Sequence, residues 1–404
     1  MADDRPVGSP ARNIGLLALA NAVLGSNQVI LSATAALTAA TMVADRSYAT
    51  VPVTLMILGT ALATGPAAWL VHTWGRREAF AFGAAVAIPA ALLAAYAAWS
   101  DQFWVFCIAL ALLGATATFP QQYRFAIADS VPPSLRARAI SWVLLGGVAA
   151  AFIGPQASIL TKDWIEGHVF AGTYLVMGIL AAVAVCVLWA TRLAPTIRNP
   201  VERRGGRSLG QLLRSAEIAV PIVTAATSYA LMNLVMVSAP LAMVYICGYS
   251  TAEAATVIQW HVVAMFAPSF ITGSVIARLG AQLTAAVGLL LIIAGAAVNL
   301  SGISVAHFTA ALVLLGVGWN FGFIASTAML ASAYRPEEAA RAQGLNEQVV
   351  FGVMALASLS SGLLLNTVGW QAVNMLAIPI AGAAILLLGL SGPARRSGRG
   401  NLAT

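Results

Sequence analysis

Four side chains with soft or borderline donor atoms form two pairs of matched spacing. Met232 and Met236 are four residues apart, and so are His261 and Met265. On a helix, residues four apart lie on one face, one turn from each other. If the chain reverses near 248–249, both pairs come to the same height between antiparallel helices. Thioethers suit copper(I) and bind zinc, manganese or iron(II) poorly, so we predict a metal site at these four residues.

The same four residues have a simpler interpretation. Methionine is a common apolar filler, and a single histidine inside a hydrophobic helix often only hydrogen-bonds a neighbour. The spacing leaves packing and ligand binding both open. What decides between them is whether this segment lines a path through the protein, which depends on the rest of the chain.

The composition is that of a membrane protein. Of the 404 residues, 60% are hydrophobic and only 9% are charged, whereas soluble domains carry about 25% charged residues. Apolar runs of about 20 residues, the length that crosses a bilayer, recur along nearly the whole chain. We predict an all-α membrane protein with twelve spans, at residues 13–40, 48–72, 78–99, 103–128, 138–161, 168–191, 215–243, 252–277, 282–301, 305–333, 340–366 and 369–390.

The basic residues follow the expected topology. Arginines gather in alternate loops and at both ends of the chain, while the loops of the other side hold only Arg46 and Lys162. By the positive-inside rule the arginine-rich side is cytoplasmic, and it includes both termini. The net charge of +7 is therefore a topological signal. A nucleic-acid partner is not expected, because no clustered basic face with interleaved aromatic residues occurs.

An internal repeat divides the chain. A shift of 205 residues superposes Gly75 on Gly280, Arg136 on Arg341 and Gly147 on Gly352. Each pair falls at the same place in its half, which indicates two six-span halves in parallel arrangement. We therefore expect an N-terminal half at 13–191, a solvated cytoplasmic linker at 192–214 and a C-terminal half at 215–390.

The loop after the second span carries a family motif. Gly75-Arg76-Arg77 closes it, and the second half repeats the pattern as Gly273, Arg278 and Gly280. These residues resemble the loop motif of the major facilitator superfamily, although His72 and Thr73 stand where its aspartate and first arginine are usual. The resemblance implies the major facilitator fold, with twelve transmembrane helices in two pseudo-symmetric six-helix halves and transport by alternating access.

Placing a polar or charged side chain inside a membrane span costs free energy, so such residues are taken as candidates for functional sites. Arg124 and Glu347 lie in spans that approach each other across the two halves of this superfamily. We therefore predict that they form a gate on the cytoplasmic side or couple transport to protons; the alternative is that each satisfies neighbours in its own half. Asn27, Asn233 and Asn320 line a cavity or link helices.

The methionine and histidine pairs bring a closer resemblance. Together with Gln259 to Gly273 and Arg341 to Asn346, they resemble the CcoA-like bacterial copper importers of this superfamily, which supply copper for cbb3-type cytochrome c oxidase. This implies import of copper across the bacterial inner membrane, with the ion as substrate, free or chelated, and with no permanently bound cofactor. It also implies membrane lipids and a cytoplasmic copper chaperone as partners, and we expect a monomer.

Two alternatives to copper import remain open. Near relatives of the copper importers carry riboflavin, so a carrier of a small organic solute would use the methionines as cavity lining. A sensor or assembly scaffold that transports nothing is a further alternative. No GxxxxGK[ST] loop and no pairing of nucleophile and base occurs in the sequence, so we predict that the protein is not an enzyme.

Overall fold

The computed structural model describes residues 8–132, 135–194 and 206–391, and within them the regular structure is entirely helical. The first half contains α1 (Pro10–Met42), η1 (Arg46–Thr50), α2 (Val51–Trp74), α3 (Arg76–Trp99), α4 (Phe103–Thr116), η2 (Pro120–Gln122), α5 (Tyr123–Asp129), α6 (Arg136–Thr161) and α7 (Ala171–Trp189). The second half contains α8 (Leu209–Arg214), α9 (Ala216–Leu241), the π-helical turn η4 (Ala242–Ile246), α10 (Thr251–Phe266), α11 (Ser269–Leu279), α12 (Ala281–Ser301), α13 (Val305–Ala333), η5 (Pro336–Glu338), α14 (Ala339–Thr367) and α15 (Trp370–Leu390).

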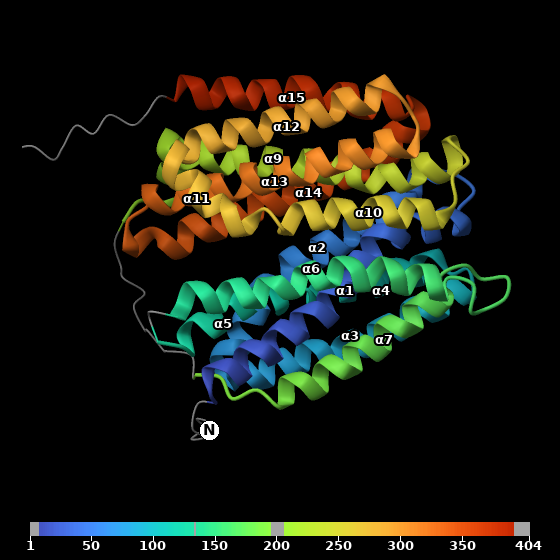
Figure 1. Ribbon diagram of the computed structural model, residues 1–404, viewed down its shortest axis with the longest axis horizontal. Helices are drawn as coiled ribbons and strands as arrows, with labels where there is room; N and C mark the ends of the chain where they lie inside the picture. Colours follow the sequence, from blue (N-terminus) through green and yellow to red (C-terminus); the bar gives the residue numbers. More distant parts are fainter. Residues whose placement is uncertain (1–7, 133–134, 195–205, 392–404) are drawn as a thin grey trace, which may run out of the picture.

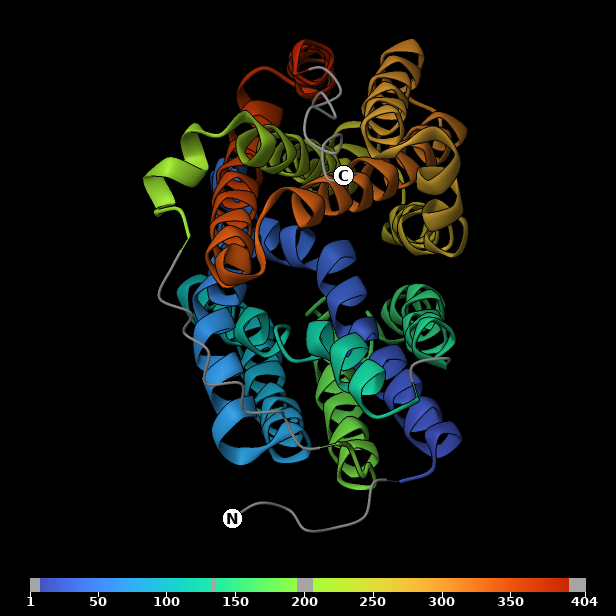
Figure 2. The ribbon, with the colours of Figure 1, turned by 90° about the vertical axis from the view of Figure 1, so that its left-hand side faces the viewer.

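The two halves form two separate bundles (Figure 1). The first half, blue to green, lies below the second, yellow-green to red. We call the end of the molecule at which α7 ends and α8 begins the linker side. Figure 2, which views the molecule from that side, shows the two bundles one above the other. Gly75 and Gly280 have matching backbone angles, with φ of 96° and 82°, immediately before α3 and α12. The repeat seen in the sequence thus recurs in the fold at this turn.

The membrane spans match the sequence prediction in number. Among the described residues, eleven helical segments are long and apolar enough to cross a membrane, and a twelfth forms when the bent pair α10 and α11 is taken as one span. The chain is therefore a multi-pass membrane protein with an all-α fold. The long linker segment 195–205, which carries three of the arginines used to orient the chain, lies outside the described residues, as do both chain ends.

Two spans that we expected to be continuous are broken. The span expected at 103–128 consists of α4, the short turn η2 and α5, and the span expected at 252–277 bends by 45° between α10 and α11. Pro120 and Pro268 stand at these breaks. Proline lacks the N–H that would continue the helical ladder, and its ring disfavours helical geometry in the residue before it.

The loop motif ties helices together inside the first half. Arg76 forms an ion pair with Asp129 at the end of α5. Arg77 pairs with Glu78 at 2.8 Å and lies 4.7 Å from the ring of Trp189 at the end of α7. The motif thus fastens the start of α3 to α5 and α7 even though its usual aspartate is absent.

Part of the linker is fixed to the second half. The carboxylate of Glu338 is fully buried and accepts hydrogen bonds from Nε, Nη2 and the backbone N–H of Arg207 at 2.8–3.0 Å, and from the backbone N–H of Arg335. Gly206, with φ of 81°, passes over the Glu338 side chain, where a Cβ atom would come within 2.6 Å of it. The residues of the linker from 206 onward are mostly exposed, as expected of a solvated segment, and Arg207 anchors them to the second half.

The halves contact each other on the side away from the linker. Gln156 of α6 donates to Gln259 of α10 at 3.0 Å, and Lys162 donates to Thr251 at 3.3 Å. The guanidinium of Arg46 lies 4.0 Å from the ring centre of Tyr245. In Figure 1 the two bundles converge at this end and diverge toward the linker side. The two halves are therefore closed against each other on the side away from the linker.

Candidate functional site

His261 lies fully buried in α10 and faces α13. Its Nδ1 is 2.7 Å from the carbonyl oxygen of Leu312, so Nδ1 carries the proton and donates it. Gly316, one turn later, makes this approach possible because a Cβ atom there would meet the backbone oxygen of His261 at 2.7 Å. In the neutral ring, Nε2 then holds the lone pair, and it has no hydrogen-bond partner among the described residues.

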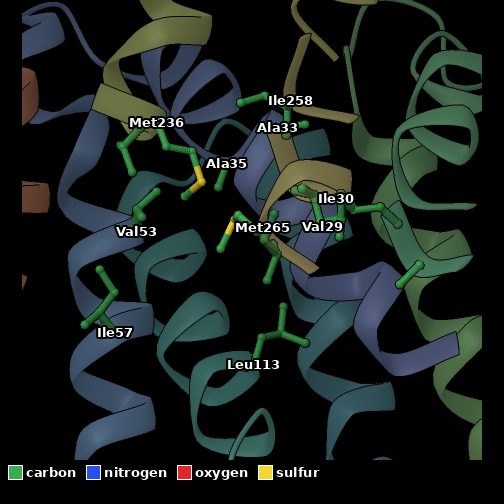
Figure 3. Close-up of a cluster of buried hydrophobic side chains, with 14 of the residues drawn as sticks. Val29, Ile30, Ala33, Ala35, Val53, Ile57, Leu113, Met236, Ile258 and Met265 are labelled. Atoms are coloured by element: carbon green, nitrogen blue, oxygen red, sulfur yellow. The ribbon is translucent and has the colours of Figure 1, made fainter. Parts of the chain in front are cut away.

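Met236 and Met265 share one apolar cluster at the contact between the halves. Figure 3 shows both thioethers directed into the group of side chains that includes Val53, Ile57 and Leu113 of the first half. Met232 is buried in the same core. The immediate surroundings of these sulfur atoms are those of apolar packing.

The expected side-by-side hairpin is only partly present. The chain does reverse at Gly248, which has φ of 75°. However, α9 packs mainly against α13 and α14, while α10 packs mainly against α13 and α6. The described hydrogen bond of His261 goes to α13 and not to α9. The pairing of His261 with Met236 therefore stays a prediction. Among the described residues, no group of three or more His, Cys, Asp or Glu side chains is placed to hold a metal ion.

The three asparagines link helices. Asn27 donates to the carbonyl oxygen of Met177 in α7, and Asn233 donates to that of Met354 in α14. Asn320 is fully buried and bridges the break between α10 and α11. These hydrogen bonds are of the helix-linking kind, and the three side chains are only 0–4% exposed; the cavity-lining role stays a prediction.

Arg124 and Glu347 face each other from the two halves on the linker side. Both are exposed, and their opposite charges act on each other across the interface. The pair is not in contact, since no N···O distance between these two side chains falls within 4.0 Å. The hydroxyl of Tyr229 in α9 also lies within electrostatic range of Arg124. This is the arrangement of an open ion pair on the side where the two halves diverge.

A cluster of aromatic rings, which the sequence analysis did not identify, lies beside this pair. Trp319 and Phe323 of α13 are stacked, with ring centres 5.5 Å apart and planes 7° apart. Tyr229 stands edge-on to both at 5.1 Å, and Phe266 of α10 lies 6.5 Å from Trp319. We call these four residues the aromatic cluster.

The aromatic cluster reaches the first half. A Cβ atom on Gly147 of α6 would lie 3.7 Å from the ring of Phe266. Tyr229 interacts electrostatically with Arg124 of α5. Two signals in the sequence mark parts of it, though not their meeting. Trp319 and Phe323 are four residues apart, and Tyr229 lies three and seven residues before Met232 and Met236, on the same helical face.

An open cavity of about 800 Å³ lies on the side away from the linker. Its lining includes Asp45, Arg46, Tyr245 and Asn366, from both halves. The Arg46–Tyr245 contact stands at its wall. None of the four methionine and histidine residues of the predicted metal site lines this cavity.

Known proteins resemble this chain over nearly its whole length. The family model of the Major Facilitator Superfamily matches residues 17–352 and 222–403. The riboflavin transporter RfnT of Brucella anthropi is 42% identical over 379 residues, covering 93% of this chain and 95% of that protein. The uncharacterized MFS-type transporters YdeG and YddS of Bacillus subtilis are each 27% identical, covering 87% of this chain and 84% and 83% of their own lengths.

Solved structures agree with the fold. The xylose transporter XylE of E. coli, in a partially occluded inward-open conformation, superposes with a TM-score of 0.69 at 12% sequence identity. The match covers 95% of this chain and 98% of that one. At this identity the likeness concerns the fold alone. It agrees with the all-helical, two-bundle architecture described above.

Proposed function

The chain belongs to the Major Facilitator Superfamily, and from this premise we propose that it carries a planar aromatic solute of the riboflavin type across the bacterial inner membrane. The observation that carries this proposal is the aromatic cluster, which lies where the two halves meet. Stacked and edge-on rings bind flat π systems through apolar contact and ring electrostatics. A transporter named for riboflavin, 42% identical to this chain, supports the same solute class.

In alternating access, the interface between the two halves opens to one side of the membrane at a time. The halves are joined on the side away from the linker through Gln156–Gln259 and Lys162–Thr251, while Arg124 and Glu347 remain apart on the linker side. We infer that the linker side is cytoplasmic, because the arginine-rich loops lie there. A solute bound at the aromatic cluster would then be released toward the cytoplasm in this conformation.

Copper import is a second candidate, and one observation favours it. His261 has Nδ1–H bonded to a backbone carbonyl, which leaves the Nε2 lone pair unpaired and buried. Metal-binding histidines are commonly held in this way. Met236 and Met265 supply thioethers in the adjoining core, and such donors suit copper(I). Transfer of the ion to a cytoplasmic chaperone, and its use for cytochrome oxidase assembly, rest on this second candidate.

Uptake of two labelled solutes separates the candidates. Cells that lack their own riboflavin and copper importers, supplied with this protein, are assayed with radiolabelled riboflavin and with radiocopper. We expect uptake of riboflavin, reduced about tenfold by Phe323→Leu, since aromatic contacts contribute up to about 1.5 kcal/mol each. Phe308→Leu, in the same helix but packed against Trp370 inside the half, serves as the matched control.

The histidine variant tests the second candidate in the same cells. His261→Ala should leave riboflavin uptake in place, because the ring faces α13 and lies outside the aromatic cluster. Copper uptake that disappears in His261→Ala, together with no riboflavin uptake by the unaltered protein, would replace the first candidate by the second. Met177→Leu in α7, a buried methionine of the other half, controls for loss of packing.

A further inference from the structure

Trp319 has a buried hydrogen-bond donor without an acceptor. Its side chain is only 7% exposed, and no described residue accepts a hydrogen bond from its indole Nε1–H. The ring is surrounded by Tyr229, Phe266 and Phe323, whose rings present no acceptor to the indole nitrogen. Indole nitrogen can only donate, so water or protein must supply an acceptor or the group remains unsatisfied.

Buried donors in folded proteins are nearly always paired, and an unpaired one calls for an explanation. A second tryptophan in the same half offers a comparison. Trp370 also has a buried, unpaired Nε1–H, but it packs against Phe308 within the half. Trp319 differs because its cluster reaches the other half: Phe266 lies beside Gly147, and Tyr229 interacts electrostatically with Arg124. Of these two tryptophans, Trp319 is thus the one that belongs to a cluster reaching the interface between the halves.

Phe266, which lies edge-on to Trp319, stands at a break in its helix. Phe266 is the last residue of α10, directly before the 45° bend to α11. The residue after Trp319, Asn320, holds both sides of that bend by donating to the Met265 carbonyl oxygen and to Ser269 Oγ, each at 2.7 Å. The bend is therefore the point at which a movement of α10 would change the position of Phe266 relative to Trp319.

We propose that Trp319 is a specificity-determining residue, whose Nε1–H donates a hydrogen bond to a ring carbonyl oxygen of the solute. The solute class is a planar heteroaromatic ring with carbonyl acceptors on its edge, which lies against the aromatic cluster. This inference rests on the proposed transport of a riboflavin-type solute. It adds that recognition depends on an acceptor atom as well as on a flat face.

Competition with labelled riboflavin uptake by the unaltered protein is the first test. Lumichrome, a flat tricyclic ring with two carbonyl groups, is compared with phenazine, a flat tricyclic ring with none. We expect lumichrome to compete at about 3- to 10-fold lower concentration, the effect of one hydrogen bond. Equal competition by the two rings overturns the inference and needs no variant.

Substitution provides the second test. Trp319→Phe keeps an aromatic ring and removes the donor, so KM for riboflavin should rise about 3- to 10-fold and the preference for lumichrome should disappear. Trp370→Phe removes the comparable donor away from the interface and should change neither quantity. A Trp319→Phe protein that retains the normal KM and the normal preference overturns the inference while leaving riboflavin transport intact. Absence of riboflavin uptake by the unaltered protein overturns the proposed function instead.

Discussion

The side-chain amide of Asn320 donates a 2.7 Å hydrogen bond to the backbone carbonyl oxygen of Met265. This carbonyl stands at the end of α10, where Pro268 and the 45° bend interrupt the helical ladder. Ser269 Oγ also accepts from the amide, and Thr272 donates to its oxygen at 2.6 Å. One buried amide on α13 thus satisfies both sides of a break in the neighbouring span.

Replacement of this amide should destabilise the protein. Asn320→Leu removes the donor to the Met265 carbonyl oxygen and to Ser269 Oγ, and the loss of such a buried hydrogen bond costs about 1–3 kcal/mol. We expect a lower melting temperature of the purified protein in detergent. Thr309→Val, in the same helix, removes a hydroxyl that bonds only its own helix and should change the melting temperature little. Equal stability of the two variants would contradict a bridging role for Asn320.

The contact between α2 and α4 depends on glycine. A Cβ atom on Gly114 would overlap the carbonyl group of Met56, whereas one on Gly65 would meet nothing within 4 Å. Gly114→Ala must push the two helices apart, at a cost of about 1–3 kcal/mol or more, and should also weaken the hydrogen bond from Thr60 to the Gly114 carbonyl. Thermal unfolding followed by size-exclusion chromatography checks this. Gly65→Ala should behave like the unaltered protein.

The stabilisation from the Arg207–Glu338 contact, which anchors the linker, should depend on pH. Hydrogen bonds from Arg207 hold the pKa of Glu338 well below its usual value of 4.5. A depressed pKa means that this interaction contributes its full stabilisation above about pH 4.5, and that the stabilisation is lost as pH falls through the lowered pKa. We therefore expect Glu338→Gln to lower the melting temperature at pH 7.

The difference in melting temperature between Glu338→Gln and the unaltered protein should become smaller below pH 4.5. Glu337→Gln, its neighbour in η5, serves as the control across the same pH range. The rate at which a protease cleaves the linker, measured at each pH, independently reports whether the Arg207–Glu338 contact still holds the linker. A melting-temperature difference that stays constant down to pH 3 would contradict the assignment to the Arg207–Glu338 pair.

Arg124 and Glu347 should act together when the linker side closes. Their charges attract each other without contact in this conformation, so the pair can form when the halves approach. Because an exposed ion pair contributes up to about 1 kcal/mol, we expect Glu347→Gln to slow transport by about fivefold. The exchanged pair, Arg124→Glu with Glu347→Arg, should recover part of the rate. Equal rates for the single and exchanged variants would show that the two charges act separately.

Much of the fold could be predicted from the sequence. The spans follow from apolar runs, because a bilayer requires each crossing segment to satisfy its own backbone hydrogen bonds. The repeat that superposes Gly75 on Gly280 located two turns of matching backbone angle. Family membership followed from the loop motif and agrees with the family model. These features are local along the chain, or repeat at a fixed interval, and a single sequence records both.

The candidate site depended on tertiary structure. Spacing placed His261 and Met265 on one helical face, but only the packing of α10 directed the imidazole toward Leu312 of α13. The rings of Tyr229, Phe266 and Trp319 come from three helices far apart in sequence, so no spacing rule brings them together. Helix rotation is set by contacts such as the close approach at Gly316. The sequence therefore determined which segments cross the membrane, and three-dimensional packing decided which side chains meet between the halves.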